Sequence, residues 1–85
     1  MDYKTAHAIA NQYVERVNIL FDSPIYDDLD NEHKRYLRRT LISEGYELIA
    51  LFVNNNCCPT KSQANPAMNK IAIAMSKVLN DNPEV

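Results

Sequence analysis

The side chains best suited to nucleophilic or metal chemistry in this sequence are two adjacent cysteines and two histidines. Cys57 and Cys58 could hold a soft metal ion or form a disulfide, but a zinc site needs a second pair of ligands at a regular spacing. His7 and His33 are far apart in the sequence, and no Asp, Ser or Cys stands at the spacing of a catalytic triad with either. We therefore interpret the cysteines as ordinary thiols and expect no enzyme, no cofactor and no metal site.

Three acidic residues follow part of the pattern of a calcium-binding loop. Asp28, Asp30 and Glu32 alternate, as the ligands do at the start of such a loop. The glycine at the sixth position is missing, and Arg39 stands where the distal acidic ligand belongs. An acidic turn that caps the following helix explains these residues instead.

The clearest electrostatic feature is an acidic segment followed by a basic one. Residues 22–32 carry five acidic side chains, and residues 33–40 carry four basic ones: Lys34, Arg35, Arg38 and Arg39. Because residues four apart share one side of a helix, the four cations are expected at one end of a helix, together with Tyr36. Such a surface suits phosphate groups or an acidic protein partner, although salt bridges to the acidic segment would also neutralise it.

Composition is typical of a small helical domain. The chain has 85 residues, 46% hydrophobic side chains and one glycine, which predicts a single all-α domain over residues 1–85, near the size at which one core is marginal. The net charge of −2 and the pI near 5.5 exclude a strongly cationic nucleic-acid binder. No apolar run reaches the ~18 residues of a membrane span, and the first residues do not resemble a signal peptide. We expect no membrane association and a cytoplasmic protein, in keeping with two cysteines that cannot staple distant segments.

Apolar spacing predicts the first helix over residues 3–21. Its apolar face repeats at steps of three and four residues: Tyr3, Ala6, Ala10, Tyr13, Val17 and Leu20. This nearly heptad-like stripe makes Tyr13 a candidate contact for a partner. Ser23 and Pro24 are typical of a helix N-cap and first position, and they predict one further helical turn over residues 24–28.

The longest predicted helix covers residues 32–53 and carries two apolar stripes. The first consists of Leu37, Leu41, Gly45, Leu48 and Phe52, and the second of Ile42, Tyr46, Ile49 and Val53. A helix that is apolar over so much of its circumference needs cover from two sides. Gly45 costs about 1 kcal/mol relative to Ala in a helix, and its missing side chain lets a neighbouring helix approach closely. A break near Gly45 is the alternative to the continuous helix that we favour.

The remaining residues predict a loop over 54–65 and a last helix over 66–80. Three asparagines suit a helix C-terminus and Pro59 prevents continuation, while Asn65 and Pro66 resemble an N-cap and first position. The apolar face of the last helix repeats at helical spacing: Met68, Ile71, Met75 and Val78. The prediction is a three-helix bundle in which the first and last helices cover the apolar half of a long central helix.

We expect a small protein-binding module that acts as an adaptor, or as an inhibitor or regulator of another protein. Compact helical chains of this kind are frequent among bacterial and phage regulatory factors, which is an analogy and not a family assignment. The apolar surface is large for the size of the domain, so a homodimer through the first or last helix is also expected. The candidate partner contacts are Lys34, Arg35, Tyr36, Arg38, Arg39 and Tyr13.

Two other functions stay open on the sequence. A nucleic-acid-associated regulator would use the basic residues 34–39, and its binding would fall steeply as salt rises. No helix-turn-helix spacing supports this alternative. A purely structural subunit would form a stable oligomer without a transferable partner.

Overall fold

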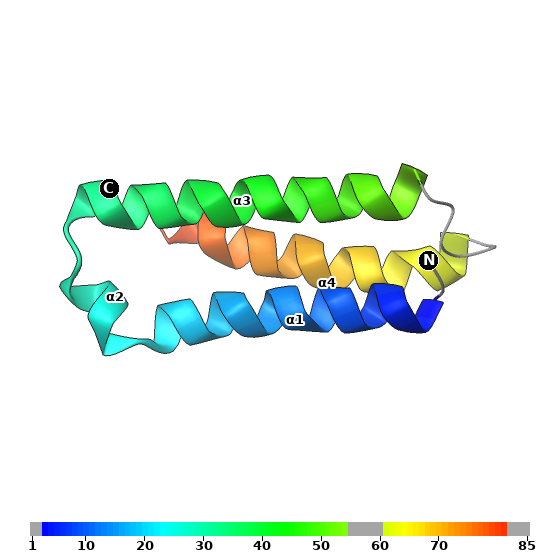
Figure 1. The fold of residues 1–85 in the computed structure, drawn as a ribbon, viewed down its shortest axis with the longest axis horizontal. Coiled ribbons are helices and arrows are strands. Elements are labelled where there is room, and N and C mark those ends of the chain that lie inside the picture. The colour runs from blue at the N-terminus through cyan, green and yellow to red at the C-terminus, as the bar shows by residue number, and fades with distance from the viewer. Residues whose placement is uncertain (1–2, 55–60, 82–85) are drawn as a thin grey trace.

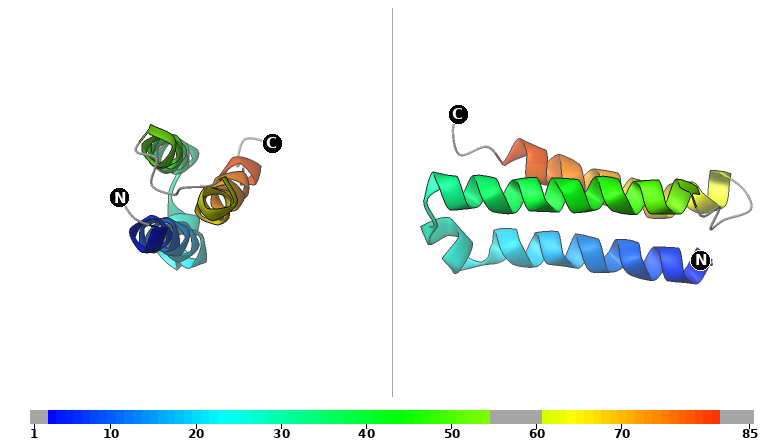
Figure 2. Two further views of the ribbon diagram at one scale, coloured as in Figure 1. Left: turned by 90° about the vertical axis from the view of Figure 1, so that its right-hand side faces the viewer. Right: turned by 45° about the horizontal axis from the view of Figure 1, so that its top comes forward.

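The computed structural model describes residues 3–54 and 61–81, and this part of the chain is helical without any strand. Its helices are α1 (Tyr3–Asp22), α2 (Pro24–Asp28), α3 (Asn31–Asn54) and α4 (Lys61–Asn80). In Figure 1, α1 and α3 lie along the two long edges and α2 joins them at one end, while α4 runs between them. Seen end on, the three long helices stand at the corners of a triangle (Figure 2). The predicted all-α class is confirmed.

The helix that holds the bundle together is α4. It packs against both α1 and α3, which contact each other far less. The core contains Ala6, Ala10, Tyr13 and Val17 of α1, Leu41 and Phe52 of α3, and Ala67, Ile71, Ala74, Met75 and Val78 of α4. The prediction that the long helix lies between the other two is therefore wrong. The physical reason is that α4 carries buried apolar side chains from Ala67 to Val78, and these pack on both neighbours.

Gly45 lies where the three long helices meet, and α3 passes it without a break, as predicted. A Cβ atom at this position would lie 2.5 Å from Met75 Sδ on α4 and 2.9 Å from the Tyr13 hydroxyl on α1. Carbon atoms in contact are ordinarily about 3.5–4.0 Å apart. Glycine therefore sets how closely α3 approaches its two neighbours.

Local capping explains the connection between α1 and α3. The Ser23 side chain accepts a hydrogen bond from the Ile25 backbone N–H at 3.2 Å, and Pro24 begins α2 over the residues that the sequence predicts. Asp30 then caps α3, because its Oδ1 accepts a hydrogen bond from the His33 backbone N–H at 2.9 Å. An acidic cap also suits the positive end of the helix dipole.

The last helix begins earlier than predicted. It starts at Lys61 instead of residue 66, so the predicted loop over 54–65 is too long. Pro66 lies inside α4, in its second turn, where the missing N–H removes one backbone hydrogen bond close to the helix end. Cys57 and Cys58 lie outside the described residues.

Neither a membrane span nor a metal-ligand cluster occurs within residues 3–54 and 61–81. No helix in these ranges is long and apolar enough to cross a membrane. No three His, Cys, Asp or Glu side chains gather there as metal ligands would. Asp30 of the acidic segment serves instead as the cap of α3.

The Asp30–His33 pair makes this end of α3 sensitive to pH. His33 Nδ1 lies 2.7 Å from Asp30 Oδ1, and both side chains are exposed. The hydrogen bond and the charge of Asp30 raise the pKa of His33, and hydrogen bonds from the backbone and ring of His33 lower the pKa of Asp30. The stabilisation is therefore fully present between the ordinary pKa values, at about pH 4 to 6.5. It is lost as pH rises through the raised pKa of His33, or falls through the lowered pKa of Asp30.

We expect Asp30→Asn to lower the pKa of His33 toward the ordinary value of 6.5, because the substitution removes the negative charge beside the ring. NMR titration of the imidazole ring protons measures this change. The ring signals of His7, at the opposite end of the bundle, serve as an internal control and should be the same in the wild type and in Asp30→Asn. A His33 titration curve that is the same in both proteins would contradict the pairing.

Candidate functional site

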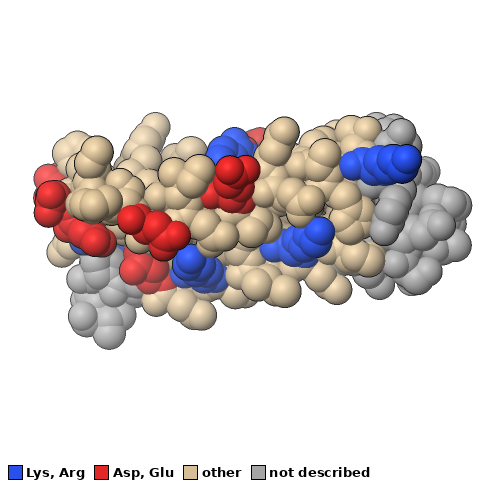
Figure 3. Space-filling view, turned by 90° about the horizontal axis from the view of Figure 1, so that it is seen from below, with Lys and Arg blue, Asp and Glu red and all other residues tan. Residues whose placement is uncertain are grey.

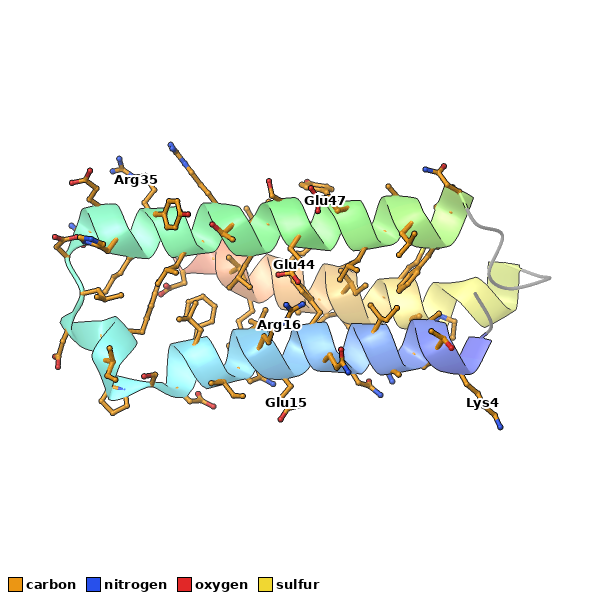
Figure 4. All side chains as sticks on the ribbon, viewed as in Figure 1. Lys4, Glu15, Arg16, Arg35, Glu44 and Glu47 are labelled. Atoms are coloured by element: carbon orange, nitrogen blue, oxygen red, sulfur yellow. The ribbon has the colours of Figure 1, made fainter. Side chains whose placement is uncertain are left out.

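The four predicted basic residues lie in two places in the structure: Lys34 lies against α2, and the three arginines line a groove between α3 and α4. Lys34 turns toward α2, where its Nζ lies 5.4 Å from the centre of the Tyr26 ring. Arg38 lies near the Tyr26 hydroxyl and also borders a groove between α3 and α4. Arg35 and Arg39 line the same groove, and Figure 4 shows Arg35 pointing away from α1. Three of the four predicted cations therefore converge on one groove.

Tyr26 of α2 fixes this end of the bundle. The side chain is 4% exposed, donates a hydrogen bond to Asp81 Oδ2 at 2.7 Å and packs edge-on against Phe21 with ring centres 5.2 Å apart. Burial, together with the hydrogen bond to Asp81, raises the pKa of Tyr26 to about 12 although the charge of Arg38 lowers it. Since α2, the start of α3 and the end of α4 all meet at Tyr26, this residue positions Arg38 at the groove.

The α3–α4 groove is cationic at one end and apolar beyond it. Its lining consists of Arg35, Arg38, Arg39, Ile42, Ser43, Tyr46, Val78 and Leu79. Val78 is 1% exposed and forms the floor, whereas Tyr46 and Leu79 are each 61% exposed. Exposed apolar side chains beside arginine are typical of surfaces that bind another molecule.

The second apolar stripe of α3 extends the groove beyond its arginine end. Ile42 and Ile49 on this stripe are half-buried, while Tyr46 and Val53 are exposed. On α4, helical spacing places an apolar flank beside the stripe: Met68, Ala72 and Leu79. The prediction that the apolar half of this helix is covered from two sides therefore holds only in part, because Ile42 and Ile49 pack against the core while Tyr46 and Val53 stay exposed. The result is an apolar face along the α3–α4 side.

The other two sides of the bundle are bridged by polar pairs. Arg16 of α1 and Glu44 of α3 point toward each other and form an ion pair (Figure 4). Lysines of α4 donate to asparagines of α1 in two hydrogen bonds of 3.0 Å: Lys70 to Asn11, and Lys77 to Asn18. The α3–α4 side differs from both in bringing three arginines beside its apolar side chains, whereas the α1–α4 side exposes Ile73 beside Lys70 and Lys77.

Charge in the groove is of one sign. Among the residues that the structure describes, no Asp or Glu lines it. Acidic side chains gather instead at the α2 end of the face seen from below (Figure 3). Arg38 Nη1 is buried and has no hydrogen-bond partner in the described part of the chain. The negative end of the α4 dipole partly offsets the three arginines, which leaves the groove able to accept a carboxylate or a phosphate.

Tyr13 and Tyr36, the two predicted aromatic contacts, lie in opposite surroundings. Tyr13 is fully buried and donates a hydrogen bond to the Leu41 carbonyl oxygen at 2.7 Å. Burial and the charge of Glu44 raise its pKa to about 12, although Arg16 lowers it. Tyr36 is 68% exposed on the outer side of α3. The expectation that Tyr13 contacts a partner is therefore corrected, because its stripe faces the core.

The comparisons with known proteins add no further information on the site. No protein-family model, curated protein or solved structure matches this chain. The function is therefore inferred from the groove itself. Tyr46 and Leu79 line the groove but are not among the partner contacts predicted from the sequence. The signal that could have found Tyr46 is the second stripe of α3, which one neighbouring helix cannot fully cover.

Proposed function

We propose that this chain is a non-enzymatic, cytoplasmic protein-binding module that regulates or inhibits another protein, or joins it to a third, through the α3–α4 groove. The observation that supports the proposal is the exposure of Tyr46 and Leu79 beside three arginines in one groove. Tyrosine and arginine are enriched among the residues that carry binding energy in protein interfaces. A contiguous apolar surface on so small a domain also favours association.

The nucleic-acid alternative has weaker support. Phosphate binding uses many cations on one surface, but Lys34 lies against the Tyr26 ring instead of beside the groove arginines. The apolar side chains of the groove would gain little from a phosphate backbone. The predicted homodimer and the bacterial or phage origin stay predictions, and sedimentation equilibrium of the purified chain tests the first.

We expect Tyr46→Asp to reduce capture of the partner protein at least tenfold, because it places a charge on the apolar part of the groove. Tagged protein is used to purify partners from a lysate of its host, with nuclease and about 0.5 M salt to screen exposed charges, and bound proteins are quantified by mass spectrometry. Tyr46 is 61% exposed, so the substitution should leave the fold intact, as circular dichroism can verify.

Ile73→Asp is the matched control for this experiment. Ile73 is 71% exposed on the flank of α4 that faces α1, beside Lys70 and Lys77. This variant should capture the same partner as the wild type. Equal loss with both variants, or capture that disappears on nuclease treatment, would contradict binding of a protein in the α3–α4 groove.

A further inference from the structure

The α3–α4 side has apolar side chains at the spacing against which a helix of another protein can pack. On α3, apolar side chains follow one another at steps of four, three and four residues: Ile42, Tyr46, Ile49 and Val53. On α4, Met68, Ala72 and Leu79 lie on the facing side at helical spacing, whereas Met75 is buried in the core. This spacing is the one that a helix packing at about 20° to its neighbours can interdigitate with. The lining of the groove on α3 runs from Arg35 to Tyr46. The second apolar stripe continues on the same side of α3 to Val53, about 27 Å from Arg35 at 1.5 Å per residue, so a helix of about 18 residues would cover both. Such a helix would turn the three-helix arrangement into a four-helix bundle.

Charge defines the chemistry of one end of that helix. Arg35, Arg38 and Arg39 border the groove near α2. In the described part of the chain no acidic residue lines the groove, and Arg38 Nη1 is buried without a hydrogen-bond partner. A guanidinium group binds a carboxylate through two parallel hydrogen bonds, which are stronger than neutral ones. Bringing an apolar helix alone against Arg38 and Arg39 would remove water from them without replacement.

A second copy of this chain is a poor occupant of the groove. If two copies joined through the same face in antiparallel fashion, the arginines of each would meet the Val53 end of the other, where neither wall of the groove offers an acid. If the two copies were parallel, the two sets of arginines would face each other and repel. The charge distribution therefore favours a chain of different sequence.

We propose that the occupant is an amphipathic helix of another protein, with an apolar stripe at steps of three and four residues and Asp or Glu at the end beside Arg35 and Arg39. This inference rests on the proposed function and adds the class of partner. The stripe lies on Ile42, Tyr46 and Leu79, and the acidic end neutralises the arginines. Nucleic acid would engage only the arginines.

A displayed library of peptides of about 18 residues tests the proposal with the full-length chain as the target. All members share an apolar stripe at helical spacing, and the polar positions at both ends vary among Glu, Gln and Lys. We expect the selected peptides to be enriched in Glu over Lys at one end. Their Kd should rise at least tenfold with Arg39→Glu and with Tyr46→Asp, and should be unchanged with Ile73→Asp. A peptide with Lys in place of Glu should recover affinity for Arg39→Glu.

The outcomes separate this inference from the proposed function. Peptides that lose binding with Tyr46→Asp but show no preference for Glu would leave the groove as a binding site and overturn the acidic helix. A library without any binder that depends on Tyr46 would overturn both. A duplex DNA of about 20 base pairs, tested in parallel, would overturn the helix in favour of nucleic acid if it alone bound, with an affinity that falls steeply with salt.

Discussion

Gly45→Leu is expected to destabilise the protein by at least about 3 kcal/mol, at the upper end of the cost of overpacking a core. The Cβ atom alone would lie 2.5 Å from Met75 Sδ, 2.6 Å from Met75 Cγ and 2.9 Å from the Tyr13 hydroxyl. Met75 is only 5% exposed and Tyr13 is fully buried, so neither can move aside without disturbing the core. Urea unfolding followed by circular dichroism measures the change in the free energy of unfolding.

Two further changes distinguish a clash of position 45 with Met75 from a general effect of a larger side chain on α3. Ala50→Leu enlarges an exposed side chain in the same helix and should change stability by less than about 0.5 kcal/mol. Met75→Ala removes the atoms closest to position 45, so combining it with Gly45→Ala should cost less than the sum of the two single changes. A Gly45→Leu variant as stable as the wild type would show that α3 and α4 are not in close contact here.

Tyr13→Ala is expected to cost about 3–5 kcal/mol, as truncation of a large buried aromatic side chain does. Tyr13→Phe should cost only about 0.5–1.5 kcal/mol, because it removes the hydrogen bond to the Leu41 carbonyl oxygen and keeps the ring in place. The difference between the two variants measures the packing of the ring between the three long helices. Thermal or urea unfolding provides the values.

Tyr36→Ala is the control for this pair, since Tyr36 is 68% exposed and its removal should change stability by less than about 0.5 kcal/mol. A Tyr13→Ala protein that is as stable as the wild type but no longer binds its partner would show that Tyr13 belongs to the binding surface. Equal losses for Tyr13→Phe and Tyr13→Ala would instead assign the whole effect to the hydroxyl group.

Local sequence patterns were sufficient to predict the helices but not their arrangement. The spacing of Ala6, Ala10 and Val17 reports correctly on the buried face of α1, and Ser23 with Pro24 marks the start of α2. Which helix packs on both of the others depends on how three apolar faces share one interior, and periodicity along one helix carries no such information. The start of α4 was predicted at Pro66 but lies at Lys61. The reason is that proline is tolerated in an early turn of a helix as well as at its first position.

The candidate groove could be predicted only in part for the same reason. The sequence places Arg35, Arg38 and Arg39 on one helix end, and three arginines do line the groove. Leu79 joins them from a helix about 40 residues away in the chain, and only the packing of α3 on α4 brings it there. Lys34 was grouped with the arginines because charge was visible in the sequence, whereas its position over the Tyr26 ring was not.

The parallel direction of α1 and α4 determines when the bundle can fold. α1 packs mainly on α4, although bonded pairs such as Asn11 and Lys70 are 59 residues apart in the chain. During synthesis the apolar face of α1 leaves the ribosome before α4 does. It stays uncovered until α4 is made, because α3 offers it few contacts. Contacts of such long range slow folding relative to a bundle of sequential hairpins. The nascent chain is therefore expected to expose Tyr13 and Val17 until α4 has emerged. A chaperone that recognises exposed apolar side chains would bind at these residues.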